Sequence, residues 1–172
     1  MLLTGTYERS LDDKFRVALP KPFRQWFADP RHVVVTPGTD GCLALFAPAA
    51  FQHLAQRLAA RSPAGQDVRA FSRLLYAQSH MVELDGQGRI RIPAELARWA
   101  GLEGEVVLVG VGDHAELWNK SRWEAYLADL QPRYDELAEK ALRAPASELS
   151  SISPLPEAVL NGRSAQEPPL PR

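Results

Sequence analysis

The chain has 172 residues, of which 45% are hydrophobic and 24% are charged, and its formal net charge is −1 at pH 7. These proportions fit an ordinary globular protein of one or two small domains, and they exclude a disordered chain or a strongly basic nucleic-acid coat protein. A near-neutral total still allows a locally basic face, because DNA responds to the local field of a surface and not to the summed charge.

The first predicted elements in chain order form a compact series. A turn at Asp12–Lys14 leads into a short strand, and Pro20 then opens a short helix. A hairpin follows, with strands at about 31–36 and 42–46 joined by the turn Gly38–Gly41. A closing helix is predicted by four apolar residues with the spacing of one helical face: Phe51, Leu54, Ala55 and Leu58. A further helical segment is predicted by Val68, Phe71, Leu74 and Leu75.

The same series then repeats. After a turn at Asp85–Gly88, Ile90 and Ile92 point to one face of a predicted strand while Arg89 and Arg91 point to the other. Pro93 opens a short helix that ends before Gly101, and a hairpin follows at about 105–111 and 115–118. The closing helix is predicted by Trp123, Tyr126, Leu127 and Leu130, and one more helix by Tyr134, Leu137, Ala138 and Ala141.

The alignment of the two halves indicates an internal duplication. Leu11–Pro20 aligns with Leu84–Pro93 at a shift of 73 residues, since 85 − 12 = 73, with Leu, Asp, Arg and Pro identical. We expect a first repeat at residues 1–60, a connecting helix at 61–78, and a second repeat with its closing helix at 79–142. Residues 143–172 hold six of the chain's 14 prolines and are expected to form a mobile tail.

The repeated Asp-x-x-x-Arg turn is the sharpest candidate for function. Its carboxylate is suited to accept hydrogen bonds from turn amides or to pair with the arginine, and the arginine is suited to contact DNA. Basic residues gather near these turns in the sequence: Arg9, Lys14, Arg16, Lys21 and Arg24 in the first repeat, and Arg89, Arg91 and Arg98 in the second. A solvated polar face is the alternative interpretation of these charges.

Other kinds of site have little support in the sequence. The four histidines lack ligand spacing, and no nucleophile stands beside a base, so we expect neither a metal, a cofactor nor catalysis. Cys42 lies in an apolar run and is interpreted as a small buried hydrophobe. The four tryptophans are expected to pack in the core or at a subunit interface. No signal peptide or membrane span is predicted, so we expect a cytoplasmic protein.

These motifs, their order and their spacing over residues 1–142 resemble the MraZ family, whose members carry two units similar to those of AbrB and SpoVT. The resemblance implies an α+β, mainly β fold, in which two tandem AbrB/SpoVT-like units form a swapped-hairpin β-barrel with flanking helices. It also implies a nucleoid-associated, ring-shaped homo-oligomer that binds short direct repeats of double-stranded DNA in the promoter of its own cell-division and cell-wall operon, as a repressor. Asp12 and Arg16 match the first motif, and Asp85 and Arg89 the second.

The DNA-contacting set is expected to be Lys14 and Arg16, with Arg9 and Arg24 on phosphates, while Asp12, Asp85 and Arg89 serve as structural turn residues. One departure concerns the glycine that the family places before the motif arginine: the second repeat has Gly88, but the first has Phe15. We expect either an altered first turn or a Phe15 side chain that fills a pocket or contacts a neighbouring subunit. The alternative function is an oligomeric protein-interaction scaffold that does not bind DNA.

Overall fold

The computed structural model describes residues 2–28, 31–61 and 65–143. The chain divides into a main part up to Asp129 and a C-terminal segment from Leu130 onward. Within the described range, that segment consists of the one-turn helix η1 (Gln131–Arg133) and α6 (Tyr134–Leu142). The predicted proline-rich tail falls, except for Arg143, outside the described residues.

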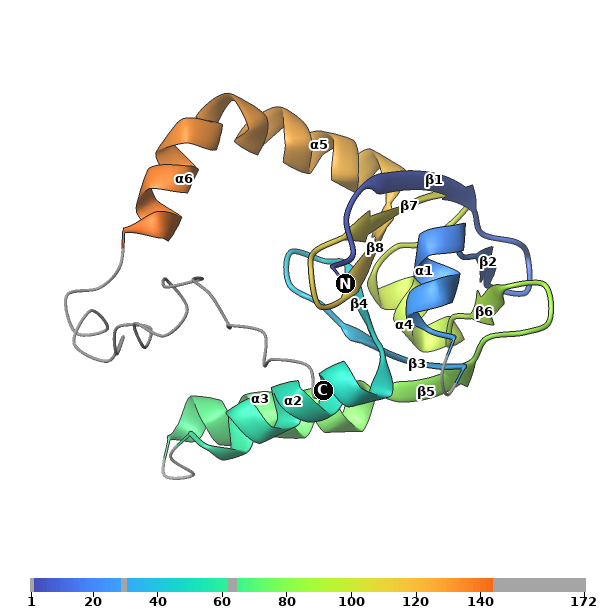
Figure 1. Ribbon diagram of the computed structural model, residues 1–172, viewed down its shortest axis with the longest axis horizontal. Helices are drawn as coiled ribbons and strands as arrows, with labels where there is room; N and C mark the ends of the chain where they lie inside the picture. The colour runs from blue at the N-terminus through green and yellow to red at the C-terminus, as the bar shows by residue number, and fades with distance from the viewer. Residues whose placement is uncertain (1, 29–30, 62–64, 144–172) are drawn as a thin grey trace, which may run out of the picture. The chain divides into compact units, whose positions relative to one another are not determined.

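The main part contains a six-stranded antiparallel sheet and a separate two-stranded ribbon (Figure 1). In spatial order the sheet comprises β1 (Thr6–Ser10), β7 (Glu105–Gly110), β8 (Ala115–Asn119), β4 (Leu43–Phe46), β3 (His32–Pro37) and β5 (His80–Glu83). The ribbon pairs β2 (Arg16–Ala18) with β6 (Arg89–Arg91).

The order of the strands shows that the two repeats exchange their first strands. β1 of the first repeat pairs with β7 of the second, and β5 of the second repeat pairs with β3 of the first. Matching bonds continue the exchange: the amide of Leu11 donates to the carbonyl of Gly104, and that of Leu84 donates to the carbonyl of Arg31, both at 2.8 Å. Each repeat therefore completes the other. The described strands form an open sheet and a separate ribbon. β1 and β5 are the two edge strands of the sheet and do not pair with each other. The closed barrel expected from the sequence is therefore not observed among the described strands.

The described residues form seven helices, and most of these follow the predictions. They include α1 (Lys21–Trp26), α2 (Pro48–Ala59), α3 (Gln66–Gln78), α4 (Ala94–Trp99) and α5 (Lys120–Leu130), besides the two of the C-terminal segment. Pro20 and Pro93 occupy the N-cap positions of α1 and α4, as expected, and Gly101 follows α4 with a φ of +62°. Strands β1 and β5 were not predicted, because both are largely exposed edge strands without a clear apolar alternation.

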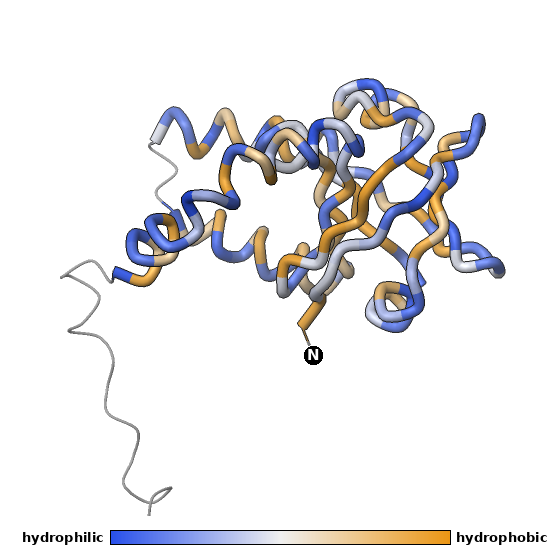
Figure 2. Tube along the Cα trace, turned by 90° about the horizontal axis from the view of Figure 1, so that it is seen from above, coloured by the Kyte–Doolittle hydropathy of each residue, from blue (hydrophilic) through white to orange (hydrophobic). Residues whose placement is uncertain are grey.

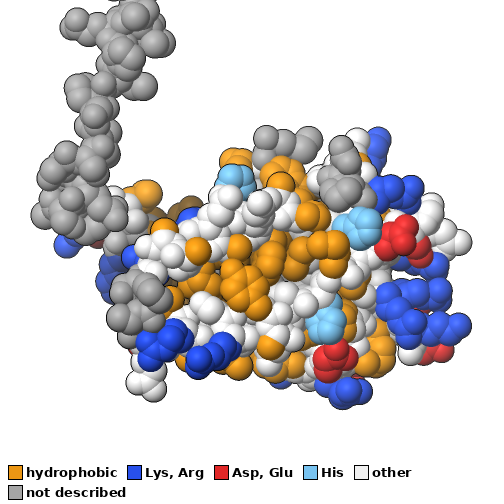
Figure 3. Space-filling model, turned by 90° about the horizontal axis from the view of Figure 1, so that it is seen from below, with side chains coloured by type: hydrophobic (Ala, Val, Ile, Leu, Met, Phe, Trp, Pro, Cys, Tyr) orange, Lys and Arg blue, Asp and Glu red, His pale blue; other side chains and the backbone are white. Residues whose placement is uncertain are grey.

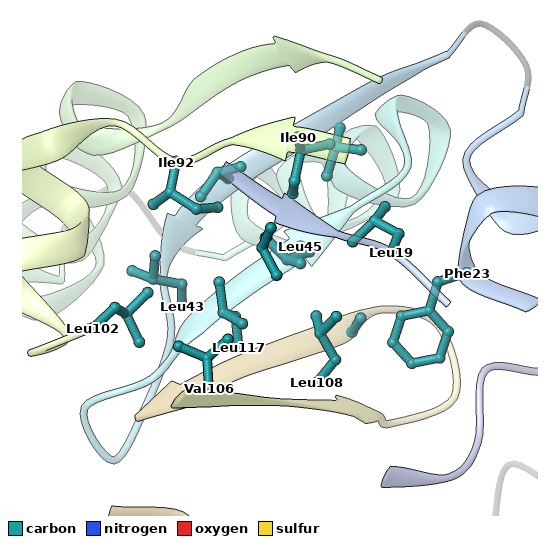
Figure 4. Packing of buried hydrophobic residues seen from close by; sticks show 14 of the residues in the cluster. Leu19, Phe23, Leu43, Leu45, Ile90, Ile92, Leu102, Val106, Leu108 and Leu117 are labelled. Atoms are coloured by element: carbon teal, nitrogen blue, oxygen red, sulfur yellow. The ribbon is translucent and has the colours of Figure 1, made fainter. Parts of the chain in front are cut away.

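The core of the main part lies between the ribbon and one face of the sheet. Val17 of β2 and Ile90 of β6 point inward and are at most 1% exposed. Figure 4 shows Ile90 and Leu19 above the sheet residues Leu45 and Leu117, with Phe23 of α1 closing one side. Figure 2 shows the same division along the chain, with hydrophobic strands inside and hydrophilic loops projecting. Burial of large aliphatic side chains, about 1.5–3 kcal/mol each, thus holds the ribbon on the sheet.

The closing helices dock on the sheet through duplicated aromatic pairs. The ring centres of Phe46 of β4 and Phe51 of α2 are 5.9 Å apart. Those of the corresponding Trp118 of β8 and Trp123 of α5 are 5.4 Å apart. The packing predicted for the tryptophans holds for Trp118, which is 3% exposed. Cys42 is fully buried, as expected, and burial raises the pKa of its thiol to about 12.

Candidate nucleic-acid interface

Both Asp-x-x-x-Arg turns have the same hydrogen-bonded geometry. In the first, Asp12 Oδ1 accepts bonds from the amides of Lys14 (2.9 Å) and Arg16 (2.8 Å). In the second, Asp85 Oδ1 accepts bonds from the amides of Gln87 and Arg89, both at 2.9 Å. The carboxylate replaces missing backbone partners inside each turn and so fixes the start of the following strand.

Each arginine also pairs with its aspartate through a single nitrogen. Arg16 Nε lies 2.7 Å from Asp12 Oδ2, and Arg89 Nε lies 2.9 Å from Asp85 Oδ2. The backbone hydrogen bond from Arg16, followed by its side-chain bond, lowers the pKa of Asp12, and Arg89 does the same for the pKa of Asp85. Because the pairing uses Nε, the terminal Nη groups are not involved in it. Both expected roles of the carboxylate, amide acceptor and arginine partner, are confirmed.

Phe15 does not alter the first turn. It adopts a φ of +57°, close to the +74° of Gly88, and its amide donates to Asp12 as that of Gly88 donates to Asp85. The expectation of a changed geometry is therefore wrong. The Phe15 side chain is half-buried and packs against the main core of its own chain. Its packing offsets the cost of a left-handed side-chain residue, about 1–2 kcal/mol.

The outer face of the ribbon carries three arginines. Arg16 pairs with Arg91 across the ribbon, and Ala18 pairs with Arg89. Because side chains alternate along a strand, these four positions share one face, and Val17 and Ile90 occupy the buried face. The alternation predicted for Arg89, Ile90 and Arg91 is confirmed. Like charges opposite one another repel, which favours a surface that meets an anion.

The remaining predicted residues do not form one group. Lys14 is exposed at the tip of the first turn. Arg9 lies on β1, where its Nη1 donates to the carbonyl of Glu8 at 2.7 Å. Arg24, which we expected beside them, instead lies over the second turn, where a Cβ on Gly88 would come within 2.2 Å of its Cδ. The exchange of strands brings this residue of the first repeat to the turn of the second.

Two arginines at this end of the molecule were missing from the predicted site. Arg91 is exposed on the ribbon, and the alternation of Arg89 and Arg91 with isoleucines was the signal that could have placed it there. Arg31 adopts a φ of +63° and donates from Nη2 to the carbonyls of Leu84 (3.2 Å) and Asp85 (3.1 Å). Nothing in the local sequence pattern indicates that contact. Figure 3 shows Lys and Arg side chains gathered, with a few acidic ones, at one end of the molecule.

The described residues contain no group of three or more His, Cys, Asp or Glu side chains placed to hold a metal ion. No helix in the same ranges combines the length and apolar character needed to cross a membrane.

The fold and the two Asp-anchored turns define a duplicated α+β protein in which each repeat completes the other. The family described as "MraZ protein, putative antitoxin-like" matches the chain twice, over residues 2–74 and 75–144. The chain therefore belongs to the MraZ family, as the resemblance indicated. Similar proteins include one from Saccharopolyspora erythraea, 40% identical over 82% of this chain and 97% of its own length. Another, from Alkaliphilus oremlandii, is 37% identical over 81% of this chain and 96% of its own. Both are named "Transcriptional regulator MraZ".

Proposed function

We propose that this protein is a sequence-specific, DNA-binding transcriptional regulator that represses its own operon of cell-division and cell-wall genes. The observation that carries the proposal is the arginine face of the β2–β6 ribbon, braced at both ends by an Asp-anchored turn. The names of the related regulators support it. Catalysis has no part in the proposal.

A two-stranded ribbon has the size that a major groove of B-DNA admits, and arginine is the residue that most often contacts guanine there. Arg16 and Arg89 enter such a contact pre-positioned, because the pairing of Nε with aspartate holds each guanidinium while the Nη groups are not part of that pair. Less side-chain entropy is then lost on binding. Lys14 and Arg16 contact the DNA in this proposal, and Arg9 and Arg24 contact phosphates.

We further propose that the sheet and ribbon act together as a barrel of the swapped-hairpin type, and that chains assemble into a ring. Exposed apolar side chains support assembly: Phe71 (52% exposed), Leu74 (60%) and Tyr76 (48%) lie on α3. Figure 3 shows hydrophobic side chains spread across the face that carries α2 and α3 in Figure 1. Interfaces that repeat head to tail close into rings when the rotation allows.

Assembly supplies the affinity that one chain lacks. A single arginine ribbon makes few phosphate contacts, but several ribbons held in one ring bind repeated promoter sites with a high effective concentration. Occupied repeats in the promoter would exclude polymerase and so reduce transcription.

The test is footprinting of the protein on the DNA upstream of its own gene, with Arg91→Ala as the variant. Arg91 is exposed on the ribbon and takes no part in either turn, so its loss is expected to weaken binding without unfolding the protein. Arg98→Ala, an exposed arginine of α4, is the charge-matched control. Selective protection of short repeats that Arg91→Ala weakens and Arg98→Ala leaves unchanged is the expected result. An intact oligomer that protects no DNA would refute the function and favour the scaffold alternative.

A further inference from the structure

The second turn is surrounded by positive charge that its own repeat does not supply. A cavity of about 280 Å³ lies beside it, lined by Arg24, Ala28, Arg31, Leu84, Asp85, Gly86 and Gly88. Three of these residues belong to the first repeat, namely Ala28 and the two arginines, Arg24 and Arg31. They reach the cavity because β3 of the first repeat pairs with β5, the strand that leads into the second turn.

The contacts fix the positions of both arginines. The Arg24 side chain crosses directly over Gly88, whose missing Cβ leaves the space that Arg24 Cδ occupies. Arg31 is held by two hydrogen bonds to carbonyls at the beginning of the turn, those of Leu84 and Asp85. Both side chains are thus directed to one turn rather than spread over the surface.

The first turn has no such pair. At the shift of 73 residues, Arg24 corresponds to Ala97 and Arg31 to Gly104. Gly104 has a φ of +60°, nearly the +63° of Arg31, so both positions have a left-handed φ but only Arg31 carries a side chain. Two pairs of corresponding residues differ between the turns. The second turn combines the small Gly88 with the large Arg24, which lies over it. At the matching positions the first turn has the large Phe15, and the helix residue is the small Ala97.

The charge balance of the cavity favours an anion. Asp85 is its single acidic lining residue, and that carboxylate is already paired with Arg89. The guanidinium of Arg24 makes no hydrogen bond or ion pair within the described ranges, although its backbone amide donates to the carbonyl of Pro20. Gly86 has open space where a Cβ would stand, so an anion can approach the backbone of the turn at that residue. A water molecule takes roughly 30 Å³ of liquid, so the cavity has room for a phosphate group with several waters.

We propose that this cavity, formed by Arg24 and Arg31 over the second turn, binds one phosphate of the DNA backbone beside the groove that the ribbon enters. The inference rests on the proposed DNA-binding function: it places the phosphate contact of Arg24 at the second turn and adds Arg31 to it. Each chain then holds DNA asymmetrically, by the arginines of the ribbon and by a phosphate anchor on one side only. Such an anchor sets the orientation of the protein on a direct repeat, because phosphate contacts fix register without specifying sequence.

The test uses the full-length oligomer and compares the wild type with Arg24→Ala, Arg31→Gly and the double variant. Each substitution installs the residue type found at the corresponding position of the other repeat, and glycine suits the positive φ of Arg31. Arg98→Ala serves again as the charge-matched control. Thermal unfolding verifies folding, and if Arg31→Gly fails to fold, Arg24→Ala alone carries the comparison.

The measured quantity is the slope of log K against log salt on the upstream promoter fragment and on a random duplex. The double variant is expected to lose about 0.9 from the slope for each bound chain, the value for one phosphate. The DNA affinity of the double variant is lower than that of wild type, and this difference in affinity shrinks roughly 3.5-fold per chain between 50 and 200 mM salt. The loss is expected on both duplexes, because a phosphate carries no sequence. A wild-type slope in the double variant would overturn the phosphate site alone. Failure of the wild type to bind either duplex would overturn the DNA-binding function as well.

Discussion

Replacing Gly88 with alanine tests how the second turn and Arg24 depend on each other. Gly88 is buried and has a φ of +74°, where a side chain costs about 1–2 kcal/mol. The new Cβ would also meet Arg24 Cδ at 2.2 Å. Arg24 is a flexible side chain on an exposed residue, so we expect it to rotate away rather than the backbone to move.

Two assays distinguish the backbone strain at residue 88 from the displacement of the Arg24 side chain. Urea or thermal unfolding of Gly88→Ala should show a loss of about 1–2 kcal/mol, roughly 2–8 °C in Tm for a chain of this size. The same loss should be found in an Arg24→Ala background, because the strain belongs to the backbone. DNA affinity should fall by the same factor in Gly88→Ala as in Arg24→Ala, with no further loss in the double variant.

Two results would refute this reasoning. A stability loss that disappears in the Arg24→Ala background would show that the clash, and not the positive φ, is the cause. A DNA affinity that falls additively in the double variant would show that Gly88 and Arg24 act independently.

Three other perturbations have defined outcomes. The lowered pKa values of Asp12 and Asp85 mean that both carboxylates stabilise the fold above the ordinary value of 3.8, and that this contribution is lost as the pH falls through their lower folded values. Urea titrations should therefore show the gap between wild type and an Asp12→Asn, Asp85→Asn variant closing in acid, whereas a constant gap would contradict the assignment. Phe15→Gly removes the left-handed cost and a half-buried ring together, so its unfolding free energy should stay within about 1 kcal/mol of wild type, and a loss well above 2 kcal/mol would show that packing dominates. Leu74→Glu should reduce the oligomer mass measured by light scattering while the exposed control Gln66→Glu does not, and an unchanged mass in Leu74→Glu would remove α3 from the interface.

The elements that the sequence predicted are those with a strong local pattern. The turns at Asp12 and Asp85 could be found because one carboxylate serves amides two and four residues away, a contact that lies within the motif itself. The alternation around Ile90 and the apolar spacing around Phe51 likewise depend on neighbours in the chain. Strands β1 and β5 were missed because an edge strand buries little and leaves no such pattern.

What only the tertiary structure decided is which charges stand beside which turn. In the sequence, Arg24 belongs with Lys14 and Arg16, and the first turn looks like the more basic one. Strand exchange changes this assignment by placing Arg24 and Arg31 beside the turn at Asp85, while Lys14 and Arg16 stay at the turn at Asp12. Pairings such as that of β3 with β5 join residues about 50 positions apart, and their energy comes from a core that forms only when both repeats are present. No local pattern encodes such a pairing, so the sequence by itself defines two similar turns, and the fold makes them different.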